Sequence, residues 1–192
     1  ELFPALADLP GALHVPGSAR LDGRLMRDSL LRAAEKRGAT VLRGDARPVR
    51  DGERVTGVDV DGRRIGADAV IIAGGAWSNA LGEAIGLRIP VAPQRGQILH
   101  LDLPDTDTSR WPIITGFHSH YMLTFPTSRV VAGATREDGS GYDYRMTAGG
   151  VHEALSEALR LAPGLAPATL REVRIGLRPA SPDHLPILGA AP

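Results

Sequence analysis

The chain has 192 residues, of which 43% are hydrophobic and 23% are charged, and this is the composition of a folded globular protein. Lys and Arg together number 22, as do Asp and Glu, so the zero net charge excludes a general nucleic-acid binder, which needs a basic surface. The absence of cysteine excludes disulfides and thiolate chemistry, and no apolar run is long enough for a transmembrane segment. Because the first residue is Glu1 rather than Met, we expect a processed chain or a piece of a longer one.

The N-terminal part of the sequence predicts a loop followed by an amphipathic helix. Proline and glycine residues within 2–15 indicate a loop. Apolar residues recur at helical spacing over 25–34, where Asp22 is placed to cap the start of the helix and Gly38 to end it. Residues 40–42, with the sequence Thr-Val-Leu, then predict a short strand.

The next segment predicts an antiparallel meander that leads into a buried strand. Asp-Gly turn signals occur at 51–52 and at 61–62. Residues 69–73 form a continuous apolar run, which is typical of a strand buried on both faces. The small residues at 74–77 would let a ligand approach the backbone, although they also fit a tight strand-to-helix turn. Ser78 is placed to cap a short helix.

The second half of the sequence predicts more strand than helix. Alternation of apolar and polar residues is clearest near the C-terminal end, where we expect Pro179 to end a strand. The predicted elements are strands at 97–103, 120–125, 129–135 and 173–178, and a helix at 150–161.

Two side chains in this half are candidates for substrate binding. Arg178 follows Gly176 on one face of a predicted strand, and the space beside the glycine suits a carboxylate bound by the guanidinium, although a structural ion pair is the alternative. Tyr121 would offer its phenol to the same cleft, or pack in the core. His118 and His120 share a face if extended, but two histidines without nearby carboxylates are a weak metal signal, and we expect no metal site.

Four stretches of the sequence form a recognisable series. They are ADAVIIAGGAWS at 67–78, PQRGQ at 93–97, VVAGAT at 130–135 and IGLRPASPDHLPILG at 175–189. In this order they resemble the D-amino-acid-oxidase-like family of FAD-dependent oxidoreductases, which includes glycine oxidase, sarcosine oxidase and D-amino acid dehydrogenase. The resemblance runs from about Gly17 to Gly189. No stretch is specific alone, whereas their order and spacing are.

The resemblance implies an α+β (α/β) fold: a mostly antiparallel substrate-domain sheet with flanking helices, plus an incomplete FAD-binding Rossmann-like domain. The implied domains follow the chain in four parts. They are a tail of a preceding substrate-domain segment at 1–15, a partial FAD-binding domain at 16–90, the substrate-binding domain at 91–175, and a return into the FAD-binding domain at 176–192.

The resemblance also implies a reaction and roles for individual residues. The full-length protein would oxidise a small anionic amino acid or amine by hydride transfer to flavin, the step of an oxidative deamination. Arg178 would pair with the substrate carboxylate and Tyr121 would contact the substrate. The residues expected to contact FAD are Val49, Ala73, Gly74, Trp77 and Gly189.

Departures from the family pattern limit this expectation. The dinucleotide fingerprint G-x-G-x-x-G, which the family places near its N-terminus, is absent from this sequence, and so is the glycine-rich segment that follows the PIIG stretch. We therefore expect a fragment that alone binds FAD weakly or not at all and is inactive.

Several alternatives stay open. The alternative within the family is a 2-hydroxy-acid or glycerol-3-phosphate-type dehydrogenase, since Arg178 suits any anionic substrate. A rival from another class is a non-catalytic binding module that kept the fold without flavin. We expect a cytoplasmic protein, or one peripheral to the membrane if it is quinone-linked, and a homo-oligomer is one assembly to test.

Overall fold

Backbone contacts divide the chain into two units. The structure is a computed structural model that describes residues 2–191, apart from the side chain of Phe117. Unit 1 comprises the chain through Arg20 together with Gln94–Leu177. Unit 2 comprises Leu21–Pro93 together with the chain from Arg178 onward. The assignment of substrate and FAD binding to particular domains stays a prediction.

Unit 1 is built around a five-stranded sheet with the order β5-β6-β7-β4-β8. The pairings of β4 with β7, β5 with β6 and β6 with β7 are antiparallel, so neighbouring strands can be joined by short turns. The strands are β4 (Ala92–Asp102), β5 (Ile114–Thr115), β6 (Tyr121–Phe125), β7 (Arg129–Gly133) and β8 (Thr169–Ala180).

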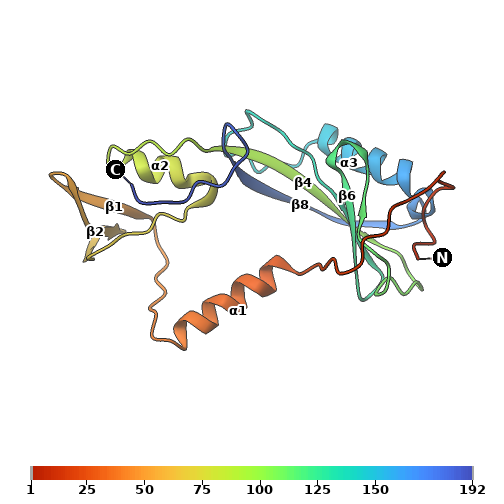
Figure 1. Cartoon of the computed structure of the whole chain (residues 1–192), viewed down its shortest axis with the longest axis horizontal. Helices are drawn as coiled ribbons and strands as arrows, with labels where there is room; N and C mark the ends of the chain where they lie inside the picture. The colour runs from red at the N-terminus through yellow and green to blue at the C-terminus, as the bar shows by residue number, and fades with distance from the viewer. Residues whose placement is uncertain (1, 192) are drawn as a thin grey trace. The chain divides into compact units, whose positions relative to one another are not determined.

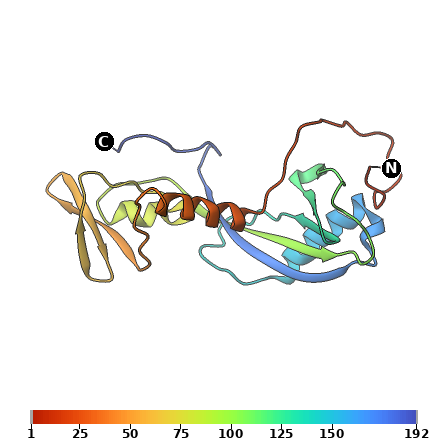
Figure 2. The ribbon, with the colours of Figure 1, turned by 90° about the horizontal axis from the view of Figure 1, so that it is seen from below.

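The register of the sheet separates a covered face from a second face. Leu99, Ala132 and Met122 are register partners across β4, β7 and β6, and all three are at most 1% exposed. They form the core with helix α3 (Ala148–Leu161), which lies along one side of the sheet in Figures 1 and 2. Side chains alternate along a strand, so the neighbouring set of register partners points to the opposite face. Tyr121 belongs to this set.

Helix α3 is favoured both by a capping residue at its start and by apolar residues at helical spacing. The Thr147 hydroxyl accepts a hydrogen bond from the amide of Gly150 and so satisfies one of the free donors of the first turn. Ala154, Ala158 and Leu161 recur at helical spacing and are buried against the sheet. The helix begins two residues before the start predicted from sequence and ends where predicted.

The N-terminal arm contributes to the same core. Phe3 is 5% exposed and its ring centroid lies 4.5 Å from that of Trp111, which is 7% exposed. The amide of Ala7 donates to the carbonyl of Leu161 at 2.9 Å, and this bond ties the arm to the end of α3. Residues 2–15 contain no helix or strand, as the sequence predicts, and they are nevertheless anchored.

Unit 2 contains a three-stranded antiparallel sheet and two helices. The strand order is β1-β2-β3, as predicted from the two Asp-Gly turns. The side chain of Arg50 donates to the carbonyl of Ile85 at 2.9 Å and so links β1 to the segment that follows α2. The elements are β1 (Ala46–Asp51), β2 (Arg54–Val60), β3 (Arg63–Gly66), α1 (Gly23–Glu35) and α2 (Ser78–Glu83).

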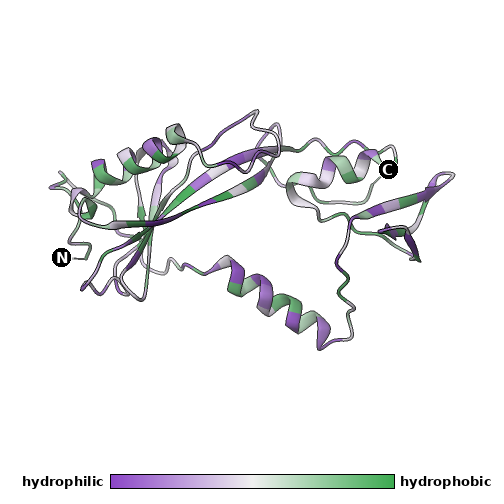
Figure 3. Cartoon of the chain, turned by 180° about the vertical axis from the view of Figure 1, so that it is seen from behind, coloured by the Kyte–Doolittle hydropathy of each residue, from purple (hydrophilic) through white to green (hydrophobic). Residues whose placement is uncertain are grey.

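Helix α1 has the predicted cap but no buried residue. The Asp22 carboxylate accepts from the amides of Arg24 and Leu25, as expected of an N-cap. None of its residues is buried, and Leu25 and Leu30 are 66% and 62% exposed. In Figure 3 hydrophobic and hydrophilic residues are interspersed along this helix. Its amphipathic pattern therefore has no packing partner among residues 2–191.

Two predicted strands, 40–42 and 69–73, are absent from the structure. A strand is stable only when its backbone groups find partners on a neighbouring strand, and residues 69–73 form no backbone hydrogen bond within the described chain. Ile71 is 89% exposed rather than buried. The predicted doubly buried strand was thus wrong for this chain, while the mixed helix and antiparallel-sheet class is confirmed.

Two predicted boundaries were also wrong. Ser78 lies inside the helical region and Trp77 occupies the N-cap without a side-chain capping hydrogen bond, so the serine does not cap α2. Strand β8 continues through Pro179 to Ala180, because β8 is an edge strand, and an edge tolerates the missing proline amide. No helix within residues 2–191 is long and apolar enough to cross a membrane.

Candidate functional site

Tyr121 lies on the sheet face that α3 does not cover. It begins β6 and is the register partner of Gly133, which in turn is the partner of Ile98 on β4. The side chain is half-buried, so its phenol lies at the surface of unit 1 rather than in the core. This placement is compatible with contact to a ligand on that face, and the role assigned to Tyr121 stays a prediction.

Arg178 lies near the end of the edge strand β8. Alternation gives its side chain the same side of the strand as Gly176 and Arg174. A Cβ atom built on Gly176 would meet nothing within 4 Å, so there is open space beside this part of the strand. Arg178 is half-buried and belongs to unit 2, whereas Tyr121 belongs to unit 1. Its carboxylate-binding role is untested.

The segment from Ala73 to Trp77 forms a tight turn with an exposed surface. The amide of Trp77 donates to the carbonyl of Gly74 at 3.0 Å, closing a 3₁₀ turn over Gly75–Trp77. A Cβ on Gly74 would lie 2.6 Å from the Cδ1 atom of Leu81, and Gly75 has a φ of 55°, so both positions favour glycine. The turn explains the glycines without a ligand.

Val49 and Gly189 lie elsewhere in unit 2. Val49 is half-buried on β1, immediately before an irregularity in the pairing of β1 with β2. Gly189 lies in the irregular segment after β8, with a φ of 150°. A Cβ atom there would have open space, so its backbone conformation rather than crowding favours glycine.

The residues of unit 2 fit part of an FAD site and not the whole of it. The amides of 69–73 lack backbone partners and Trp77 is 43% exposed, which leaves polar and aromatic groups open to a nucleotide. The pyrophosphate of a dinucleotide requires a glycine-rich loop at a helix N-terminus, and this sequence has no such fingerprint. The described residues therefore offer groups for the nucleotide and no glycine-rich loop for the pyrophosphate.

A buried polar network, centred on Arg95, joins β4 to the segment after β7. Arg95 is 8% exposed and forms ion pairs with Glu137 at 2.7 Å and Asp143 at 2.8 Å. Gln97 is fully buried, and its side-chain amide donates to Glu137 and to Thr147, each at 2.7 Å. These contacts hold residues 135–147 against the sheet.

The carboxylates of this network remain ionised because hydrogen bonds and nearby arginines stabilise their negative charge. Burial raises the pKa of Glu137, but hydrogen bonds from Gln97, Thr135 and Arg95 outweigh burial and lower that pKa below its usual value. Hydrogen bonds from Arg145, assisted by Arg95, hold the pKa of Asp143 well below its usual range. Sequence reasoning treated PQRGQ only as a family motif. The signal it missed is Gln97 on the same strand face as the apolar residues Leu99 and Leu101.

The two histidines weighed as metal ligands point to separate carboxylates on α3. His118 Nδ1 lies 3.2 Å from Glu157, and His120 Nε2 lies 3.3 Å from Glu153. Within residues 2–191 no three His, Asp or Glu side chains are grouped as metal ligands. The pairs connect the turn before β6 to α3.

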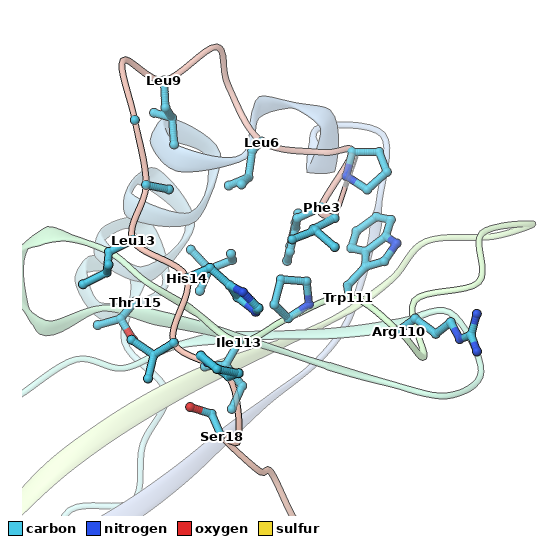
Figure 4. A pocket seen from close by; sticks show the side chains of 18 of the residues that line it. Phe3, Leu6, Leu9, Leu13, His14, Ser18, Arg110, Trp111, Ile113 and Thr115 are labelled. Carbon is cyan, nitrogen blue, oxygen red and sulfur yellow. The ribbon is translucent and has the colours of Figure 1, made fainter.

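An open pocket, lined by both apolar and polar residues, lies between the N-terminal arm and the segment 110–115 of unit 1 (Figure 4). Phe3 and Trp111 pack together at one end, while Arg110 extends away from the pocket. Arg20 also lines the pocket and donates to the carbonyl of Ser109 at 2.7 Å. None of the residues predicted to bind substrate or FAD lines this pocket.

Comparisons with known proteins place this geometry in a family. The family model described as FAD dependent oxidoreductase (DAO) matches residues 1–192. A solved structure of iminodiacetate oxidase from Chelativorans sp. BNC1 is 50% identical, with a TM-score of 0.95, over 100% of this chain and 52% of that chain. Glycine oxidase from Geobacillus kaustophilus is 28% identical, with a TM-score of 0.85, over 100% of this chain and 51% of that chain.

A curated relative agrees with these structures. The uncharacterized oxidoreductase YurR of Bacillus subtilis (strain 168) is 47% identical over 100% of this chain and 52% of its own length. The chain thus spans about half the length of the relatives it matches. The D-amino-acid-oxidase-like resemblance is confirmed, and the chain belongs to the DAO family of FAD-dependent oxidoreductases.

Proposed function

We propose that the full-length protein containing this chain oxidises an amino acid or amine with FAD as the electron acceptor. FAD, when bound, accepts the hydride that leaves the substrate α-carbon, and the amine becomes an imine that water hydrolyses. The observation that carries the proposal is Arg178 beside the open space at Gly176, on a strand of a chain that belongs to this family. Residues 91–175 would bind substrate, and residues 16–90 and 176–192 would hold part of the FAD.

Arg178 and Tyr121 would orient the substrate. A guanidinium binds a carboxylate through two parallel hydrogen bonds, and this fixes the rotation of the α-carbon and its C–H bond. The phenol of Tyr121 would donate a hydrogen bond to the same ligand. Neither side chain needs to act as a base, because the hydrogen leaves with its electron pair.

Residues of unit 2 would contact the cofactor. The exposed indole of Trp77 and the open backbone at Ala73 and Gly74 support contact with the nucleotide. Val49 and Gly189 would complete the contacts supplied by this chain. Because the chain lacks the pyrophosphate loop, we expect a purified sample of these 192 residues to show no stoichiometric flavin absorbance.

The relatives suggest a series of substrates for the test. The iminodiacetate oxidase acts on a secondary amine with two carboxylates, and the glycine oxidase on an amine with one. A panel of iminodiacetate, glycine, sarcosine and glycolate therefore separates dicarboxylic from monocarboxylic amines, and amines from a hydroxy acid.

The experiment is anaerobic flavin bleaching in the full-length protein. We expect amines of the panel to reduce the flavin and glycolate to leave it oxidised. Arg178→Met should raise the apparent Kd for the substrate carboxylate about 10- to 100-fold, and Arg178→Lys should restore part of the loss. Bleaching by glycolate alone would replace the amine proposal with a hydroxy-acid dehydrogenase, and a full-length protein without flavin would favour a non-catalytic module.

A further inference from the structure

Arg136 directly follows Thr135, between two residues whose side chains are anchored on the α3 side of the sheet. The Thr135 hydroxyl accepts from the amide of Gln97 at 2.9 Å and donates to Glu137 at 2.7 Å. Glu137 in turn accepts from the buried side chains of Gln97 and Arg95. With residues 135 and 137 directed to one side of this extended segment, alternation directs the side chain of Arg136 to the other.

The side chain of Arg136 therefore projects from the same face of the sheet as that of Tyr121. Gln97, Leu99 and Leu101 point toward α3, since Gln97 lies against Gly150 of α3 and the two leucines are in the core. Tyr121 is aligned with Ile98, which lies between Gln97 and Leu99 and so has the opposite orientation. Both side chains belong to unit 1.

Other arginines of this sheet have partners, and Arg136 has none within residues 2–191. Arg95 is paired with Glu137 and Asp143, and Arg174 with Glu172. Arg171 is paired with Asp102, although at 3.5 Å and with a more exposed side chain. Arg136 is exposed, and no hydrogen bond or ion pair of its guanidinium occurs in the described chain.

The backbone beneath Arg136 is unusually well held for an exposed residue. Thr135 is fully buried, and Arg95 and Glu137 exchange backbone hydrogen bonds at 2.9 and 3.1 Å. The cation is thus presented from a rigid base, which reduces the conformational entropy lost when an anion binds.

We propose that Arg136 determines specificity by binding a second carboxylate of a dicarboxylic amine substrate. This inference rests on the proposed function, and it narrows the substrate class of that same site. The Tyr121 face of unit 1 would then hold this second carboxylate. A guanidinium without an internal partner loses no ion pair when it takes up a carboxylate, so the gain is not offset by a broken bond.

The test uses the full-length flavoprotein and the substrate panel above. In Arg136→Gln we expect kcat/KM for the dicarboxylic amine to fall about 10- to 100-fold, with less than about a threefold change for sarcosine. Arg136→Lys should recover part of the loss, because the charge is kept without the planar fork. The control is Arg160→Gln, on the exposed side of α3, which should change neither substrate.

A binding readout separates specificity from a general loss of activity. The ligands are malonate and acetate, which cannot be oxidised, and we expect each to perturb the absorbance of the oxidised flavin when it binds. The preference for malonate over acetate should drop about 10-fold or more in Arg136→Gln and stay unchanged in Arg160→Gln. Equal losses for one and two carboxylates, or an unchanged preference, would overturn the role of Arg136 while leaving the proposed function intact. A wild-type protein in which no amine bleaches the flavin would instead refute the proposed function.

Discussion

Units 1 and 2 bury their apolar residues to very different extents. In unit 1 the core residues Leu99 and Met122 are at most 1% exposed, and the polar groups nearby are joined in a network around Arg95. In unit 2 the whole of α1 contains no buried residue, and Ile71 is 89% exposed. The same kinds of sequence pattern, a helical stripe and an apolar run, thus produce a packed core only where partners lie within the chain.

The largest expected effect tests this difference in packing directly. Leu99→Ala in unit 1 should cost about 2–5 kcal/mol, because it removes a fully buried side chain and leaves a cavity. Leu30→Ala in α1 should change stability by less than about 0.5 kcal/mol, since that leucine is 62% exposed. Urea titration with peptide-resolved hydrogen exchange would measure both. Equal costs would mean that α1 is packed in solution, contrary to the comparison.

The polar network of unit 1 should make its stability depend on pH. The folded-state pKa of Glu137 is lowered, so its contribution is present above the usual value of 4.5 and is lost as the pH falls through the lowered pKa. Glu137→Gln should cost about 1–3 kcal/mol at pH 7, and the gap to wild type should shrink below about pH 4.5. Urea midpoints of unit 1 between pH 3 and 7 measure it, and a gap independent of pH would contradict the charge assignment.

Two adjacent glycines of α3 provide a matched pair. A Cβ on Gly150 would lie 1.9 Å from the side-chain amide of Gln97, so Gly150→Ala should displace Gln97 and cost about 1–3 kcal/mol. A Cβ on Gly149 would meet nothing within 4 Å, and Gly149→Ala should stabilise the helix by about 0.5–1 kcal/mol. In thermal unfolding, the melting temperature should fall for Gly150→Ala and rise for Gly149→Ala. A change of the same sign in both would contradict the position of Gln97 against Gly150.

The smallest expected effect concerns the cap of α1. Asp22→Ala removes the acceptor of the Arg24 and Leu25 amides and should cost the helix about 0.5–1 kcal/mol. Because α1 lacks buried contacts, the change should appear as faster amide exchange over 23–35 with no shift in the unfolding of unit 1. Transmission of the change to α3 would show that the units are coupled.

The comparison also explains which elements can be predicted from sequence. Helix α1 and the β1-β2-β3 meander follow from local signals, namely the Asp22 cap and the Asp-Gly turns, and these need no distant partner. The run 69–73 was predicted to be a buried strand, yet strand formation depends on neighbours that local pattern does not supply. Tertiary context, rather than propensity, decided that element.

In the candidate site, too, the features that depend on local sequence pattern could be predicted, and those that depend on distant partners could not. Alternation along β6 and β8 places Tyr121 and Arg178 on strands as predicted, while their roles stay untested. The anchoring of residues 135–147 by Arg95 was missed, because ion pairs between residues more than forty positions apart leave no periodic signal. Arg136 escaped notice for the same reason, since its orientation depends on that anchoring.

The distribution of tryptophan has a practical consequence. The chain has two tryptophans, and one lies in each unit: Trp111, buried against Phe3, and Trp77, 43% exposed. Their fluorescence should therefore differ in emission maximum and in access to quenchers such as acrylamide. Replacing either one by phenylalanine would leave a single tryptophan, and selective excitation of that indole would follow the melting of its own half of the molecule without any added label.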